Sequence, residues 1–337
     1  MQAETGATLR VTKQMQVPMA ATRFRRYATV EPQHVALAPS VMPSTALAPG
    51  GIIGAVEHRA PVSVVACITS YNFPMINMAG KLAPALAMGN TVVVKPAWQD
   101  PLGVIRMAEV FEEAGFPPGA VNLITSETVE PAEAIVASPH VDMVSFTGST
   151  AVGCRIASVA GNGMKRLLLE LGDPRERDTV LGPVITCAHR DRVEGYVTSA
   201  RDQGAEVAAG GERPGMERGF YVAPTLLAGC TPEMTVAQEE IFGPVIVAIP
   251  FDEEEEEEAV ALANGTPFGL YDYVFSADTA RAMAVARQLR SGTVGVNTAQ
   301  RNHEAAFGGF KFSGVGRDGG SWGLHAYSEF QSLVWNG

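Results

Sequence analysis

The sequence predicts an α/β protein built on a parallel sheet of the Rossmann type, with helices on both faces. Between residues 61 and 171, short β-branched apolar runs alternate with stretches that place apolar residues at helical spacing. Continuous apolar runs of this kind are typical of strands buried on both faces of a parallel sheet. The 35 glycines and 22 prolines fit a fold with many tight turns between strands and helices.

The first half divides cleanly into such elements. Asp100 precedes an apolar-periodic stretch and Gly115 follows it, so we expect Asp100 as the N-cap and Gly115 as the stop of one helix. The expected strands are 62–69, 91–94, 121–124, 143–147 and 166–171, and the expected helices are 73–88, 101–114, 131–137 and 150–160.

The flanking parts are less regular. Residues 19–27 have an amphipathic pattern, and the proline- and alanine-rich stretch 31–51 indicates an extended arm. A glycine-rich loop is expected at 307–320, and a final strand at 327–335 could complete a sheet in another subunit. Between them we expect helices 188–203, 253–264 and 279–290 and strands 206–209, 221–228, 245–250, 271–275 and 293–297.

Length and charge exclude several classes of protein. A chain of 337 residues can bury two domains, and a net charge of -11 argues against a nucleic-acid surface. No run of about eighteen apolar residues is present, so no membrane span is expected. We interpret the acidic run Asp252–Glu258 as a solvated helix start, because its like charges repel one another and cannot converge on one ion, so no metal site is expected there.

The four cysteines are Cys67, Cys154, Cys187 and Cys230. Their spacing matches no zinc or redox motif, and no secretory signal is recognisable at the start of the sequence. We therefore expect reduced, structural or incidental thiols in a cytoplasmic protein.

One turn has the composition of a phosphate-binding site. Gly148-Ser149-Thr150-Ala151-Val152-Gly153 follows an expected strand and opens a helix, so its backbone N–H groups could approach a pyrophosphate. An ordinary strand-to-helix turn would have the same pattern. Lys95 ends another strand at the sheet edge where ligands bind, and could contact ribose or phosphate or simply lie at the surface.

An ordered set of motifs carries a resemblance to a known family. The motifs are Tyr71-Asn72-Phe73-Pro74, Val94-Lys95-Pro96-Ala97, Ala114-Gly115-Phe116-Pro117-Pro118-Gly119, Phe146-Thr147-Gly148-Ser149, Leu169-Glu170-Leu171-Gly172, Glu239-Glu240-Ile241-Phe242-Gly243-Pro244, Phe307-Gly308-Gly309-Phe310-Lys311 and Ser313-Gly314-Val315-Gly316-Arg317. In this order they resemble the NAD(P)-dependent aldehyde dehydrogenase superfamily over roughly residues 57–335.

The resemblance implies a role for each matching residue. Asn72 matches the amide that stabilises the tetrahedral intermediate, and Glu170 matches the base that activates water. The cofactor would be NAD or NADP, held by residues that match the family's ribose, pyrophosphate and nicotinamide contacts: Lys95, Gly148, Ser149, Gly153, Glu240 and Phe242. Trp98 stands where relatives often have a glutamate that binds the adenosine ribose, so the choice between NAD and NADP stays open.

One departure from the family pattern concerns the nucleophile. In the family, several dozen residues with a GQ-x-C motif follow the strand that ends in the base, and that cysteine attacks the aldehyde. Here Gly172 passes directly to Asp173-Pro174-Arg175, so the segment with the nucleophilic cysteine is expected to be missing. The resemblance then divides the chain into a helix and arm (1–50), a dinucleotide-binding domain (51–172), an incomplete α/β catalytic domain (173–320) and a C-terminal segment with an oligomerisation strand (321–337).

Three functions are compatible with this pattern. The first is an aldehyde dehydrogenase relative that binds NAD(P) and a small aldehyde but is impaired in oxidation. The second is a non-catalytic partner that joins copies of itself or full-length relatives through the strand at 327–335. The third is a defective gene product without a selected function.

Overall fold

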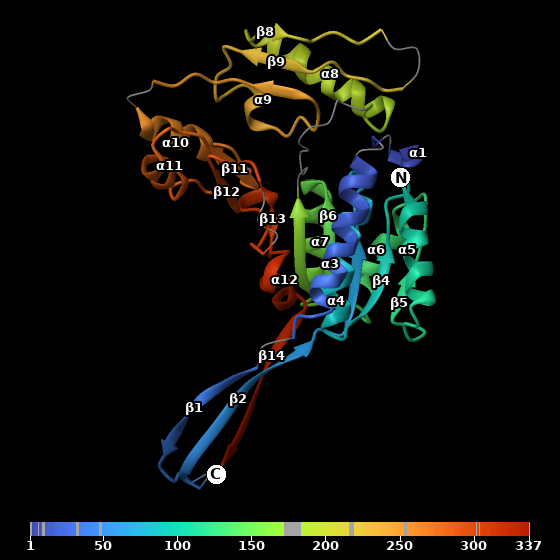
Figure 1. The fold of residues 1–337 in the computed structure, drawn as a ribbon, viewed down its shortest axis with the longest axis vertical. Helices are drawn as coiled ribbons and strands as arrows, with labels where there is room; N and C mark the ends of the chain where they lie inside the picture. The colour runs from blue at the N-terminus through green and yellow to red at the C-terminus, as the bar shows by residue number, and fades with distance from the viewer. Residues whose placement is uncertain are drawn as a thin grey trace.

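The protein is described from a computed structural model, which defines residues 2–5, 7–8, 11–31, 34–46, 49–171, 183–215, 219–252, 255–300, 302 and 304–336. Figure 1 shows three parts: a central sheet covered by helices, a second group of small sheets and helices, and a long ribbon of strands that projects away from the body. The junction at Gly172–Asp173, where the sequence departs from the family pattern, lies outside the described residues.

The central sheet has six strands in the order β13-β7-β6-β3-β4-β5, and all but β13 are parallel. The order reverses direction between β3 and β6, which is the arrangement of a doubly wound dinucleotide-binding sheet. The strands are β3 (Val64–Ile68), β4 (Thr91–Lys95), β5 (Val121–Leu123), β6 (Met143–Gly148), β7 (Arg166–Leu171) and β13 (Gly314–Val315). The five parallel strands confirm the predicted Rossmann-type sheet.

Helices bury both faces of this sheet. One face packs a core with Val65, Leu82 and Met143, which are at most 1% exposed, and the other packs Val144 and Phe146. The helices that follow the strands are α4 (Pro74–Ala87), α5 (Pro101–Glu113), α6 (Glu130–Ala137) and α7 (Thr150–Asn162). The first core also contains residues of α3 (Val17–Tyr27) and α12 (Gly320–Ala326), so both ends of the chain pack onto the same face.

The second half of the chain forms two small sheets. The first has the order β10-β9-β8 and surrounds a separate core with Val193, Val197 and Leu227. Its elements are α8 (Cys187–Asp202), β8 (Glu206–Ala209), β9 (Thr225–Ala228), α9 (Thr235–Gln238) and β10 (Val245–Val247). The second pairs β11 (Tyr271–Val274) with β12 (Thr293–Val296), beside α10 (Glu256–Asn264) and α11 (Thr279–Ala286).

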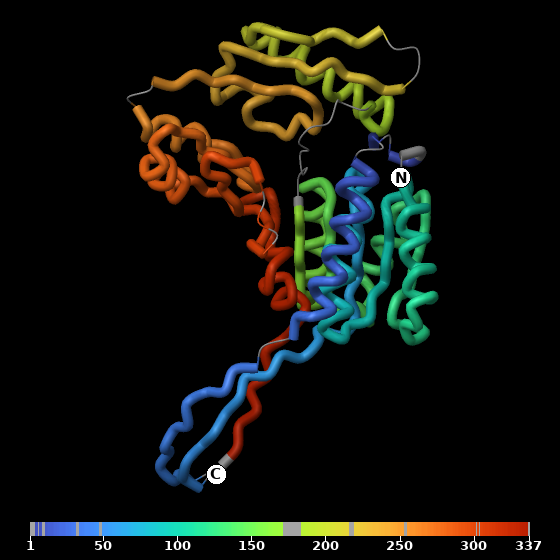
Figure 2. The backbone as a smooth tube through the Cα atoms, viewed as in Figure 1, coloured from blue at the N-terminus to red at the C-terminus, as the bar shows by residue number. Residues whose placement is uncertain are grey.

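The projecting ribbon is a three-stranded antiparallel sheet in the order β1-β2-β14, which Figure 2 shows as a long arm extending from the body. Its strands are β1 (Val35–Met42), β2 (Gly51–Pro61) and β14 (Ser328–Asn336). The final strand was predicted correctly. The predicted extended stretch 31–51 contains β1, and β1 pairs with β2, a strand that the sequence pattern did not indicate.

Other local predictions need correction. The expected strand at 221–228 is limited to β9, and the expected loop at 307–320 contains a 3₁₀ turn (Lys311–Ser313) and β13. Gly314 pairs with Glu170, and a Cβ at Gly314 would lie 2.1 Å from the Leu169 carbonyl oxygen, so only glycine fits this strand. The chain begins with α1 (Gln2–Thr5) and a π-helical turn (Thr12–Gln16). No helix in the described ranges is long and apolar enough to cross a membrane.

Candidate functional site

The predicted site residues gather at the carboxyl ends of the parallel strands. Tyr71 and Asn72 follow β3, while Gly148 ends β6 and Ser149 opens the next helix. The sheet order reverses between these two strands, and a crevice at that point is where open α/β sheets bind their ligands. Lys95 is the last residue of β4 and Glu170 the penultimate residue of β7, so both lie at the same edge of the sheet.

The helix after β6 begins without a side-chain cap. Ser149 is the N-cap residue of α7 and is extended (φ -68°, ψ 148°), and its hydroxyl accepts no bond from the helix. The N–H groups of the first helical turn therefore lack the side-chain acceptor that a cap would supply. The oxygens of a phosphate group could accept hydrogen bonds from them instead. Thr150 Oγ1 donates to the carbonyl of Phe312 (3.2 Å), which places the 307–320 segment at the border of this turn. Gly153 is buried inside α7.

Lys95 is not a surface lysine. Its side chain is 7% exposed, and burial lowers the pKa of its ammonium. In the described part of the chain its Nζ makes one hydrogen bond, to the Pro96 carbonyl (3.2 Å), while an ammonium can donate three. A buried lysine with unused donors at this edge suits the hydroxyl or phosphate oxygens of a nucleotide.

Asn72 and Glu170 are both held in a fixed orientation. The Asn72 Oδ1 accepts from Ser70 Oγ (2.5 Å) and from the Phe73 N–H (3.0 Å), which fixes the plane of the amide. The half-buried Glu170 accepts through Oε2 from Thr147 Oγ1 (3.0 Å) on the neighbouring strand. An oriented amide donor and a carboxylate base are the groups that addition to a carbonyl and its hydrolysis require.

The second half contributes Glu240 and Phe242 from the loop after α9. Phe242 is left-handed (φ 57°), and its ring meets Tyr71 edge-on with the centroids 6.3 Å apart. His189 Nε2 donates to the Phe242 carbonyl (2.5 Å), and Arg192 donates to the Glu240 carbonyl (2.8 Å). The loop that carries Glu240 and Phe242 is therefore held by α8, and its Phe242 ring contacts Tyr71, the residue just before Asn72.

Sequence reasoning missed the buried polar groups beneath the site. Lys81, 2% exposed in α4, donates to Ser145 Oγ (3.3 Å), and this hydroxyl bonds the Tyr327 hydroxyl (2.8 Å). Arg23 forms an ion pair with Asp318 and is also attracted by Glu170. The signal for Lys81 was a charged residue in the apolar helix pattern of α4, while nothing local marks Arg23.

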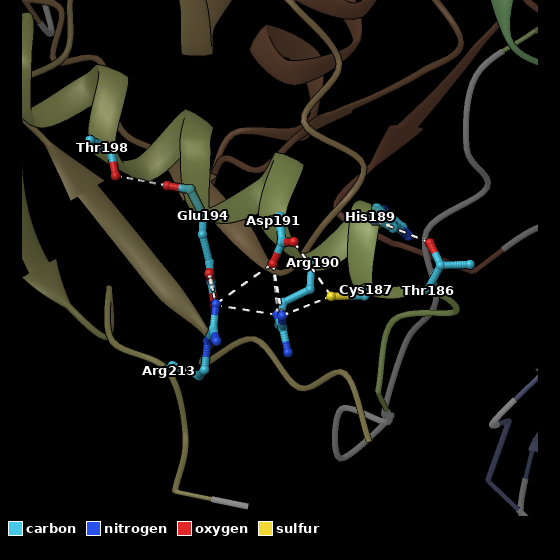
Figure 3. A network of polar contacts seen from close by, with 8 residues as sticks. All are labelled: Thr186, Cys187, His189, Arg190, Asp191, Glu194, Thr198 and Arg213. Atoms are coloured by element: carbon cyan, nitrogen blue, oxygen red, sulfur yellow. Dashed lines mark hydrogen bonds and ion pairs between the residues drawn. The ribbon is translucent and has the colours of Figure 1, made fainter. Parts of the chain in front are cut away.

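Two of the four cysteines are buried and two are exposed. Cys67 is fully buried in β3, where burial raises the pKa of its thiol to about 12, and Cys230 is buried after β9. Cys154 is exposed on α7. Cys187 is exposed at the start of α8, where it donates to Asp191 (3.4 Å) and accepts from Arg190 (3.0 Å), as Figure 3 shows. In the described residues no thiol bonds Asn72 or Glu170.

Asp100 follows the Lys95 strand and does not cap its helix as expected. It occupies the N-cap position of α5, but Glu4 Oε1 accepts the Leu102 N–H (2.7 Å), and both Asp100 carboxyl oxygens are buried without a partner. Burial, with a further contribution from Glu4, raises the pKa of Asp100 to about 8. The carboxyl is therefore protonated in the folded protein at pH values where the unfolded chain has already lost the proton.

This sets a pH dependence. Between the unfolded value of about 3.9 and the folded value, the native state binds the extra proton, so stability falls as the pH rises. We expect Asp100→Asn to be more stable than the wild type by a margin that grows from pH 5 to pH 8, by at most about 1.4 kcal/mol per pH unit. Urea unfolding at several pH values measures this margin. The exposed Asp202→Asn is the control, and an equal, flat margin for both variants would contradict the assignment.

The fold and the arrangement of these groups define a class: a doubly wound nucleotide-binding domain with an amide donor and a carboxylate at the carboxyl edge of its parallel sheet. Comparisons with known proteins narrow this class. The aldehyde dehydrogenase family model matches residues 1–173 and 171–333. The putative aldehyde dehydrogenase DhaS of Bacillus subtilis is 31% identical over 395 aligned residues, which cover 98% of this chain and 77% of that protein. The chain belongs to the aldehyde dehydrogenase family.

Comparison with solved structures also supports membership of the aldehyde dehydrogenase family. Apo betaine aldehyde dehydrogenase from Staphylococcus aureus superposes with a TM-score of 0.91 and 30% identity, covering 99% of this chain and 78% of that one. The Mycobacterium tuberculosis aldehyde dehydrogenase, solved in complex with NAD⁺, has a TM-score of 0.88 and 30% identity, with 98% and 79% covered. The predicted aldehyde dehydrogenase-like fold is therefore confirmed.

Proposed function

We propose that the chain binds NAD or NADP at the edge between β3 and β6, and that its thioester route of aldehyde oxidation is impaired. The proposal is carried by the presence of the cofactor-binding groups together with the absence of a suitably placed thiol among the described residues. The groups suited to a dinucleotide are present at one sheet edge, while among the described residues no thiol is hydrogen-bonded to Asn72 or Glu170. The two segments of the family match meet at 171–173, where the sequence lacks the cysteine motif.

The residues fit the cofactor one by one. The uncapped start of α7, with Ser149 and the close turn at Gly148, would hold the pyrophosphate. Lys95 would bond the adenosine ribose, and Glu240 and Phe242 would hold and pack the nicotinamide half. The complexes of related enzymes with NAD⁺ support this assignment. When bound, the nicotinamide supplies the acceptor for two electrons from the substrate.

The remaining groups could act on a hydrated aldehyde. Asn72 would donate from its amide to the substrate oxygen, and Glu170 would take the proton of the hydrate hydroxyl. This path avoids the thioester, but it needs the hydrate in the pose that a thiol would otherwise fix by a covalent bond. We therefore infer weak oxidation with cofactor binding intact.

Cofactor titration tests the proposal. We expect NAD or NADP to bind in calorimetry, and Lys95→Ala to weaken binding by roughly 10–100-fold, because hydrogen bonds from a charged donor contribute about 1.5–3 kcal/mol. The exposed Lys13→Ala is the matched control, and Glu170→Gln should change the affinity little. A wild type that binds neither dinucleotide, or a Lys95→Ala variant that binds as well as the wild type, would contradict the proposal.

A second candidate function is favoured by the arm. β14 is an edge strand, and Val334 and Trp335 on it are 62% and 52% exposed, so a further strand or sheet could pack there. On this alternative the chain joins copies of itself or full-length relatives without catalysing a reaction. Light scattering and co-purification test it, and a monomer that captures no relative would count against it.

The same measurements address the remaining alternative, a defective gene product. A defective product would be poorly soluble and would bind no dinucleotide. We place the working protein in the cytoplasm, because its four cysteines are free thiols.

A further inference from the structure

The projecting arm carries a pair of histidines that no part of the proposed cofactor site uses. Val35 in β1 pairs with Glu57 in β2, which sets His34 opposite His58 across the two strands. Their rings stack with centroids 4.6 Å apart and an interplanar angle of 15°. The two Nδ1 atoms are only 3.1 Å apart, closer than the ring centres, so the same nitrogen of each ring is turned toward the other.

We propose that His34 and His58 form a two-nitrogen site for a divalent transition-metal ion of the Zn²⁺, Ni²⁺ or Cu²⁺ class. Two nitrogens at this separation, each about 2.0–2.1 Å from one ion, subtend a nitrogen–metal–nitrogen angle of roughly 95–100°. That angle lies between square-planar and tetrahedral coordination. Imidazole nitrogen suits these ions, whereas Mg²⁺ and Ca²⁺ require oxygen ligands.

The electrostatic surroundings permit the ion. Side chains alternate along a strand, so the neighbours Glu57 and Arg59 lie on the opposite face from His58. There Glu57 accepts from Ser332 (2.8 Å), and Arg59 lies 3.9 Å over the ring of Phe330. The residue that pairs with His58 on its other side is the neutral Gln331, and β1 carries no charged residue. Among the described residues, the strand partner of His58 and the residues of β1 bring no guanidinium or ammonium to the histidine face.

The proton between the rings marks the same position. At 3.1 Å, only one Nδ1 of the pair can carry hydrogen, which it donates to the lone pair of the other. An ion bound between the rings uses the lone pairs of both Nδ1 atoms, and each neutral ring then carries its hydrogen on Nε2. In the described residues no group of three or more His, Cys, Asp or Glu converges on a point, so water completes the coordination and binding is weaker than in a closed site.

Metal binding would stabilise the pairing of β1 with β2 at the edge of the arm. Every residue of β1 is exposed, so this edge strand gains little from burial. An ion held by one histidine from β1 and one from β2 would join the two strands, and any ligand that binds only the folded form raises its stability. The inferred role of the ion is to cross-link β1 and β2 in the arm, independently of the cofactor site.

Calorimetry on the untagged chain tests the site with Ni²⁺, and with Zn²⁺ as a second probe. We expect one ion per chain at pH 7.5. His34→Gln and His58→Gln should each lower the affinity at least tenfold, and the exposed His140→Gln should leave it unchanged. Because protons compete with metal for imidazole, the affinity should also fall at least tenfold at pH 5.5. Hydrogen exchange in β1 should slow on adding Ni²⁺ to the wild type only.

Several results would overturn the proposal. Unchanged binding in both His34→Gln and His58→Gln would do so, as would an equal loss in His140→Gln. One ion per two chains, with a doubled mass in light scattering, would show that the ion links two molecules and does not cross-link β1 and β2 within one chain. Both histidine variants change an arm surface away from the core, so the circular dichroism of the wild type should be retained.

Discussion

Aldehyde oxidation by the purified chain is expected to be at least about a thousandfold slower than oxidation by a full-length relative assayed beside it. Loss of a catalytic nucleophile commonly costs several orders of magnitude in rate, because binding and the oxyanion donor alone remain. A panel of aldehydes with saturating NAD or NADP, followed by absorbance of the reduced cofactor, measures this difference. Glu170→Gln should remove what activity remains, because the hydrate would lose its base.

The thiols provide the matched control for that result. Cys154 and Cys187 are the exposed cysteines, so Cys154→Ala and Cys187→Ala should leave the residual rate unchanged. Intact-mass spectrometry after adding substrate should show no thioester. A rate within tenfold of the full-length relative, or its loss in Cys187→Ala alone, would mean that this chain has recruited another nucleophile.

The parallel sheet could be predicted because its strands are specified locally. Each of the five strands is a short apolar run bounded by turn residues, and the observed ends differ from the expected ones by two residues or fewer. The topology then brings the carboxyl ends of such strands to one edge. This is why Lys95, Ser149 and Glu170, chosen from the sequence, lie along the same edge of the structure.

The parts that were missed depend on distant partners. β2 has no strong apolar alternation and exposes residues on both faces, so its identity as a strand comes from pairing with β1 and β14. β13 is a two-residue strand whose glycine is required by the close approach of β7. Asp100 had the local signature of a cap, but Glu4 from the start of the chain took its place. No pattern near these residues reveals such contacts.

Arg23→Leu is expected to lower the free energy of unfolding by about 3–5 kcal/mol, since removing one partner leaves the other charge buried and unpaired. Arg23 on α3 pairs with Asp318, whose side chain is only 6% exposed. Burial disfavours the charged guanidinium, yet Asp318 and Glu170 outweigh it and keep the pKa of Arg23 above its ordinary value. Urea unfolding followed by circular dichroism measures the loss.

Two further variants separate the ion pair from general damage to the helix. Arg106→Leu breaks a surface pair with Glu109 in which both side chains are well exposed, so it should change stability little. The double variant Arg23→Leu with Asp318→Leu should recover much of the stability lost in Arg23→Leu, because it removes the unpaired carboxylate. Since Asp318 follows β13, and β13 pairs with Glu170, a chain without this ion pair should also bind the dinucleotide less tightly. If Arg23→Leu costs no more than Arg106→Leu, the packing of α3 and not the buried charge pair holds the chain around Asp318 against the candidate site.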